Sequence, residues 1–113
     1  MSRNLCLTRE CLGVVTRIEC AVRPLADGHG QWTLLCAAGM NAAQPSLVSA
    51  QGPFCGPGVA EAVLAGIAVS LLAQGYVICL ELPIWQLHMQ AQLRRLNHQR
   101  CHYQGRYPLQ PES

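Results

Sequence analysis

The seven cysteines and four histidines are the side chains of this 113-residue chain with the greatest potential for chemistry. Cys55 is the best placed of them, because it lies just before a predicted helix. The free N–H groups and the dipole of a helix N-terminus stabilise a thiolate, so Cys55 is a candidate redox cysteine. The alternative is that Gly56, Pro57 and Gly58 simply form a helix entry, and we favour it.

Residues 54–58 resemble the Cys-Gly-Pro-Cys segment of thioredoxins, but Gly58 stands where the second cysteine would be. Disulfide exchange needs that second thiol to release the mixed disulfide. The segment also follows a predicted hairpin rather than the beginning of a βαβ unit. A redox protein built on Cys55 is therefore the weaker hypothesis, and we expect a Cys55→Ser variant to keep its function.

His98, Cys101 and His102 are closely spaced nitrogen and sulfur donors. A structural zinc site needs four ligands with paired spacings, and the remaining cysteines do not supply the missing pair. The six acidic residues offer no neighbouring pair of carboxylates for acid–base catalysis. We therefore predict no catalytic, cofactor-binding or metal-binding residue, and we expect a protein that is not an enzyme and needs no cofactor.

The composition predicts one folded domain over residues 1–113, since half of the residues are hydrophobic and only 12% are charged. A net charge of +2 is too small to indicate direct binding of nucleic acid. The N-terminus has no apolar core of a secretory signal, and the odd number of irregularly spaced cysteines argues against a disulfide framework. We expect a cytoplasmic protein with reduced thiols.

Residues 14–23 alternate between two faces, which predicts a half-buried strand, and residues 31–40 predict a second one. The glycines between them predict a turn, so the two strands should form an antiparallel hairpin. Residues 1–13 are predicted to be an N-terminal arm or short helix. The proline- and glycine-punctuated stretch 41–57 is predicted to be a loop, and residues 104–113 a flexible tail.

Residues 59–74 form an almost wholly apolar helix pattern, and strand-forming residues follow at 76–82. The uncharged run from Ala62 to Leu80 raises the alternative of a small membrane-associated protein. Gly66, Ser70 and the Gln74–Gly75 turn interrupt that run, so we favour a buried helix that is covered on more than one side.

The last predicted helix, over residues 83–100, carries two separate apolar stripes. One stripe suffices to dock a helix on its own domain, so a second stripe indicates a partner; the alternative is a small domain that wraps both sides. The first stripe consists of Trp85, Met89, Leu93 and Leu96. If it is core, Ile84, Leu87 and Ala91 become the candidates for the exposed face. The predicted partner-binding residues are Trp85, His88, Met89, Gln92, Leu93, Arg95 and Leu96.

The whole chain resembles the QslA family, the small quorum-sensing anti-activators of pseudomonads, in its length and in the general pattern of the run from residue 52 through residue 100. This resemblance implies a cytoplasmic protein that binds a LuxR-type transcription activator and blocks its action. It implies no catalytic residue. The expected mechanism is that the protein prevents the activator from dimerising and thereby from binding DNA.

The expected fold is α+β, with a small antiparallel three-stranded sheet over residues 14–23, 31–40 and 76–82. Two main helices, over residues 59–74 and 83–100, are expected to pack on it. Because the other face of the sheet and the second helix stripe would still need cover, we also expect a homodimer.

Overall fold

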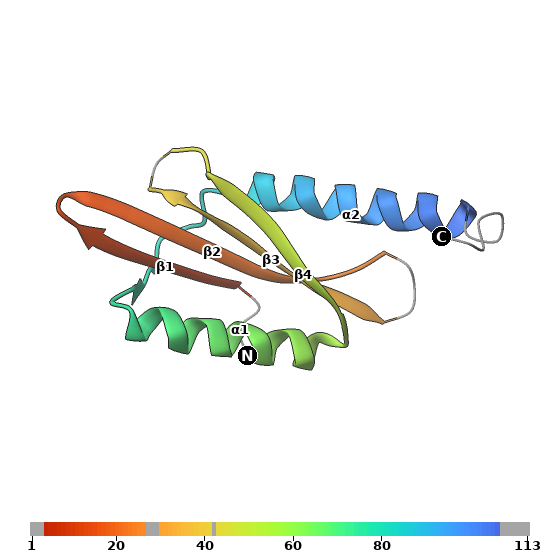
Figure 1. Cartoon of the computed structure of the whole chain (residues 1–113), viewed down its shortest axis with the longest axis horizontal. Coiled ribbons are helices and arrows are strands. Elements are labelled where there is room, and N and C mark those ends of the chain that lie inside the picture. Colours follow the sequence, from red (N-terminus) through yellow and green to blue (C-terminus); the bar gives the residue numbers. More distant parts are fainter. Residues whose placement is uncertain (1–3, 27–29, 42, 107–113) are drawn as a thin grey trace.

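The computed structural model describes residues 4–26, 30–41 and 43–106, which form one antiparallel sheet and two helices (Figure 1). The sheet has five strands in the order β4-β3-β2-β1-β5. The elements in chain order are β1 (Asn4–Cys11), β2 (Val14–Pro24), β3 (Gln31–Met40), β4 (Leu47–Cys55), α1 (Pro57–Ala73), β5 (Val77–Ile78) and α2 (Gln86–Arg106).

The predicted hairpin is confirmed, because β2 and β3 pair antiparallel from Thr16↔Met40 to Pro24↔Trp32. The period of two in β2 sorts its side chains between two cores. Cys20 and Val22 point to the α1 side of the sheet, and Ala21 points to the α2 side. Strands β2 and β3 lie inside the sheet and are covered on both faces, so they supply most of the buried side chains.

The prediction of three strands is wrong, since the sheet has five. The predicted N-terminal arm or short helix is strand β1, whose Leu7 is completely buried. The predicted loop contains strand β4, where Gly52 and Pro53 are tolerated because β4 is an edge strand and needs ladder bonds on one side only. The predicted strand over residues 76–82 is reduced to the two residues of β5.

The two helices lie on opposite faces of the sheet (Figure 1). Helix α1 packs through Ala60 and Leu64, and α2 packs through Met89, with Trp85 just before its first residue. The sheet face that was expected to require a second subunit is therefore covered by α2. Helix α2 starts three residues later than predicted and includes residues 104–106 of the predicted tail, whereas residues 107–113 lie outside the described residues.

The uncharged run over residues 62–80 is divided between α1, a turn at Gln74–Gly75 and β5. Gly75 has a φ of 97°, a left-handed conformation that suits glycine at the end of a helix. Among the described residues, neither helix is long and apolar enough to cross a membrane.

Candidate functional site

The apolar members of the predicted partner-binding set face the sheet. Trp85 is only 1% exposed and Met89 is buried with it, while Leu93 and Leu96 are partly buried against the same cluster. His88 and Arg95 are exposed on the solvent side of α2, and Gln92 is intermediate and accepts a hydrogen bond from Arg95. The structure thus divides the set between core and surface instead of bringing it together as one face.

The second stripe of this helix is the more exposed one. Leu87 is 75% exposed and Ile84 is also exposed, whereas Ala91 is half-buried. The exposed residues next to Leu87 in the first turns of α2 are Gln86, His88 and Gln90, so this stripe offers a single large apolar side chain within α2 rather than a continuous surface.

A buried ion pair fixes the start of α2 on the sheet. Glu19 accepts from Arg17 Nε at 2.6 Å, and both side chains are almost fully buried. The Glu19 carboxylate also accepts the backbone N–H of Ile84 at 2.8 Å and of Trp85 at 3.0 Å. Arg17 in turn donates to the Leu82 carbonyl at 3.0 Å. These bonds satisfy both buried charges and place Trp85 over the sheet.

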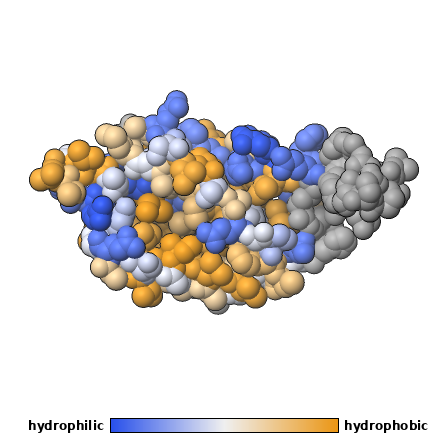
Figure 2. All heavy atoms as spheres, viewed as in Figure 1, coloured by the Kyte–Doolittle hydropathy of each residue, from blue (hydrophilic) through white to orange (hydrophobic). Residues whose placement is uncertain are grey.

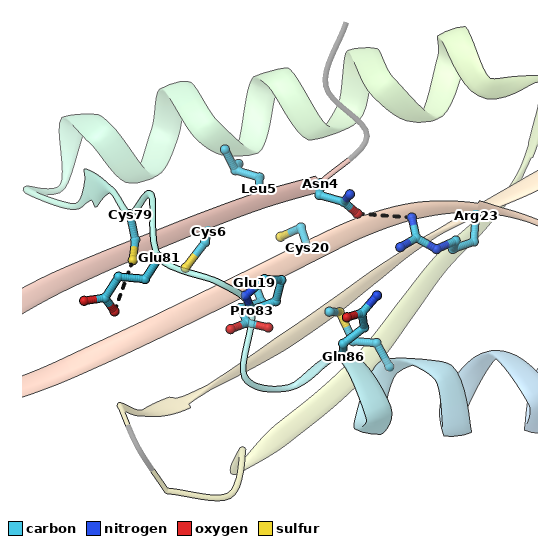
Figure 3. Close-up of a pocket in the computed structure, with 11 residues that line it drawn as sticks. Asn4, Leu5, Cys6, Glu19, Cys20, Arg23, Cys79, Glu81, Pro83 and Gln86 are labelled. Atoms are coloured by element: carbon cyan, nitrogen blue, oxygen red, sulfur yellow. Dashed lines mark hydrogen bonds between the residues drawn. The ribbon is translucent and has the colours of Figure 1, made fainter.

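A cavity of about 240 Å³ lies beside this ion pair, between β1, β2 and the segment that leads into α2 (Figure 3). Its polar lining includes Cys6, Cys79, Glu81 and Arg23. Burial, followed by the hydrogen bond with Cys79, raises the pKa of Cys6 to about 12, so this thiol stays protonated near neutral pH.

The two carboxylates that line the cavity, Glu19 and Glu81, both accept hydrogen bonds from the protein. The two oxygens of Glu19 accept from Arg17, Ile84 and Trp85. Cys79 donates to Glu81 at 3.8 Å, as Figure 3 shows. These polar contacts hold the chain between β5 and α2 in place. The cavity itself is smaller than typical ligand pockets.

The redox hypothesis for Cys55 and the zinc hypothesis for the histidines and cysteines near the end of α2 have little geometric support. Cys55 is exposed in β4, directly before Gly56, which is the N-cap of α1. Across the described residues, no group of three histidine, cysteine or acidic side chains is placed to hold a metal ion. Of the zinc candidates, His98 is exposed on α2, and nothing is described for the side chains of Cys101 and His102.

The feature that sequence analysis missed is the outward side of α1. Figure 2 shows hydrophobic residues gathered along the lower part of the molecule, where Figure 1 places this helix. In this helix Val69 is 68% exposed, Leu72 is exposed one turn after it, and Val59 is exposed near the start of the helix. Eight exposed residues make up this surface, which we call the α1 outer face: Gly58, Val59, Ala62, Ala65, Gly66, Val69, Leu72 and Ala73.

These eight residues are contiguous on the helix. At 100° per residue they lie within a sector of about 140°, opposite the buried Ala60 and Leu64. Glu61 is the one charged residue of α1, and it lies just outside this sector. Beyond the helix, Val77 and Ile78 of β5 are also exposed. The sequence signal was present, since α1 is hydrophobic all round, but it was interpreted as burial.

Comparison with known proteins gives a family. The chain belongs to the PA4575-like protein family, which matches residues 1–113. Neither the curated proteins nor the solved structures give a match.

Proposed function

We propose that this protein is a protein-binding regulator of the cytoplasm that acts as an anti-activator. It binds a LuxR-type transcription activator through the α1 outer face and prevents that activator from dimerising and binding DNA. The observation that carries this proposal is the exposed, uncharged surface of α1, in a protein whose other helix turns polar residues to solvent. The resemblance to the QslA family supports the choice of partner.

The α1 outer face has the composition of a contact surface. Contiguous exposed apolar patches of this kind mark protein interaction sites, because water is released when a partner covers them. Val59, Val69 and Leu72 supply most of the apolar area. Covering apolar surface contributes about 25 cal/mol per Å², so a partner gains most by covering these three side chains together.

The small residues of the α1 outer face determine how closely a partner can approach it. Ala62, Ala65 and Gly66 lie in the middle of the face and let another helix approach closely. Because the face carries no charge, its partner must present an apolar surface as well. An apolar helical dimerisation surface on the activator would meet both conditions, and a helix can replace a helix–helix contact at little geometric cost.

The competition needs only a modest difference in affinity. An advantage of about 2.7 kcal/mol over self-association of the activator is roughly a hundredfold preference for the mixed complex. A dimeric DNA-binding protein depends on two half-site contacts, so an activator held as a monomer loses most of its affinity for the operator. No catalytic step is required of the inhibitor.

We also propose that two copies pair through the α1 outer face when no activator is present. One of the two reasons for expecting a homodimer has gone, because α2 covers the second face of the sheet. The remaining support is that a two-fold pairing of uncharged helices brings no like charges together. Such a homodimer would dissociate as activator is added.

The test is to mix the purified protein with a purified LuxR-type activator and to measure the mass of the complex in solution. We expect one activator chain in each complex and loss of operator binding in the same mixture. A complex that keeps an activator dimer on its operator would contradict the proposed mechanism. A protein that is monomeric on its own but still binds the activator would contradict only the homodimer.

A further inference from the structure

Two pairs of cysteines face each other across neighbouring strands. Cys20 of β2 is opposite Cys36 of β3 in the ladder. Cys79 follows β5 and donates its backbone N–H to the carbonyl of Cys6 in β1 at 2.8 Å, so these two residues are also opposite each other. The pairs differ in their position in the hydrogen-bond pattern, and that difference decides which one can be joined.

The register of β2 and β3 places Cys20 and Cys36 at a non-hydrogen-bonded position. The N–H of Asn41 donates to the Val15 carbonyl at 2.9 Å, and the N–H of Leu25 donates to the Gln31 carbonyl at 2.8 Å. These bonds mark the odd-numbered residues of β2 as the bonded positions, so the even-numbered Cys20 lies between them. Opposite Cα atoms are about 4.5 Å apart at such a position, compared with about 5.5 Å at a bonded one.

Opposite side chains also approach more closely at a non-hydrogen-bonded position, which suits a disulfide because its Cβ atoms are only about 3.8 Å apart. The sulfur atoms of Cys20 and Cys36 already share a hydrogen bond at 3.4 Å. Cys6 and Cys79 occupy the more widely spaced, bonded type of position. Geometry therefore favours a covalent bond for the first pair over the second.

The two sulfurs of the first pair differ in access. Cys20 is only 2% exposed beneath Ala60 and Leu64 of α1, whereas Cys36 is half-buried at the rim of the same cluster. The hydrogen bond with Cys20 lowers the pKa of Cys36 although burial opposes it, and the same bond and burial raise the pKa of Cys20. The accessible thiol is thus also the one that ionises first.

We propose that Cys20 and Cys36 are a redox-active dithiol which small disulfides such as oxidised glutathione convert to a disulfide between β2 and β3. The Cys36 thiolate attacks one sulfur of oxidised glutathione, forms a mixed disulfide and releases one glutathione thiolate. Cys20 then loses its proton and attacks Cys36 Sγ, which expels the second glutathione. The protein loses two electrons and two protons, and one oxidised glutathione becomes two reduced ones.

This chemistry is separate from the activator-binding surface. The pair lies on the inner side of α1, in contact with the residues that hold the helix on the sheet. It also differs from the Cys55 hypothesis, because it supplies the resolving thiol that Cys55 lacks.

The test uses the full chain with Cys11, Cys55 and Cys101 replaced by serine, which leaves the two facing pairs. After incubation with oxidised glutathione and alkylation of the remaining thiols, we expect the mass of the protein to fall by two hydrogen atoms and two alkyl groups to be added. Peptide mapping should place the disulfide at Cys20–Cys36. Circular dichroism before oxidation checks that the background is folded.

Single substitutions separate the two steps. In Cys20→Ser the resolving thiol is gone, so a glutathione adduct should accumulate on Cys36. In Cys36→Ser neither a disulfide nor an adduct on the buried Cys20 should form. The matched variants Cys6→Ser and Cys79→Ser should still form the Cys20–Cys36 bond. A disulfide mapped to Cys6–Cys79, or four alkylated cysteines after oxidation, would overturn the proposal.

Discussion

Helices α1 and α2 cover opposite faces of the same sheet but present opposite surfaces to solvent. The outward side of α2 carries exposed His88, Gln90, Arg94 and Arg95, with Leu87 as its large apolar exception. The outward side of α1 carries eight exposed residues without a charge. Since the sheet requires the same cover on either side, packing of this domain does not explain the apolar outer face of α1.

The helices also differ in how they are attached. The start of α2 is held by the buried Glu19 carboxylate, which accepts two backbone N–H groups of the segment that enters the helix. Helix α1 begins at Pro57, its N-cap Gly56 offers no side-chain hydrogen bond, and Ala60 and Leu64 hold it on the sheet. One helix therefore depends on a polar anchor, while the other depends on apolar packing alone.

The largest effect is expected from removing the polar anchor. Glu19→Ala leaves the buried Arg17 without its ion-pair partner and two N–H groups without an acceptor, so the free energy of unfolding should fall by about 3–5 kcal/mol. Urea denaturation measures the loss. The matched control is Glu81→Ala, because Glu81 also approaches Arg17, at 3.6 Å, but is 77% exposed. It should cost at most about 1 kcal/mol. Equal losses would show that Glu19 is not the anchor.

The second-largest effect on the free energy of unfolding is expected from a substitution on the inner side of α1, compared with one on its outer side. Leu64→Ala removes a buried side chain from the cluster beneath the helix and should lower the free energy of unfolding by about 2–4 kcal/mol. Val69→Ala, one turn further along on the outer face, should change it by less than about 0.5 kcal/mol. Denaturation of both variants under the same conditions checks the difference. A large loss for Val69→Ala would mean that its side chain is covered in the isolated protein.

The smallest effect is expected from Gly66→Ala, which should increase the stability of the protein but weaken its binding to the activator. An added Cβ at Gly66 meets no atom within 4 Å, and the residue lies in the middle of an exposed helix face. Gly66→Ala should therefore raise the free energy of unfolding by about 0.5–1 kcal/mol, because alanine restricts the unfolded chain and favours helix. If a partner helix packs closely there, the same change should weaken activator binding. Thermal unfolding and titration calorimetry measure the two effects, and tighter binding would contradict close packing.

Local sequence patterns were sufficient for the hairpin and for the presence of both helices. The alternation of β2 and the apolar run of α1 are properties of neighbouring residues, so they can be recognised without a structure. Strand β1 was missed because residues 1–13 were interpreted as an N-terminal arm or short helix, although Leu7 becomes buried in the sheet. Strand β4 was missed because Gly52 and Pro53 indicate a loop unless the strand is known to be at an edge.

The candidate site depended on information that sequence periodicity does not contain. Periodicity identified the stripe of Trp85 and Met89, but not whether the sheet or a partner would cover it. The deciding contact joins Glu19 to Trp85, 66 positions apart, and such a distant pairing appears only in the fold. The same limit explains why the α1 outer face was not foreseen, because an all-apolar helix gives no indication of which side is buried.

The central claim is that the α1 outer face, and not the outward side of α2, binds the activator. The most direct measurement is the affinity of two charge substitutions at equally exposed positions, Val69→Arg on α1 and Leu87→Arg on α2, for the same purified LuxR-type activator. Both variants should keep the native free energy of unfolding within about 0.5 kcal/mol. Val69→Arg should weaken binding at least about a hundredfold, or about 2.7 kcal/mol, whereas Leu87→Arg should leave the affinity nearly unchanged. Native affinity for Val69→Arg, or a larger loss for Leu87→Arg, would contradict the claim.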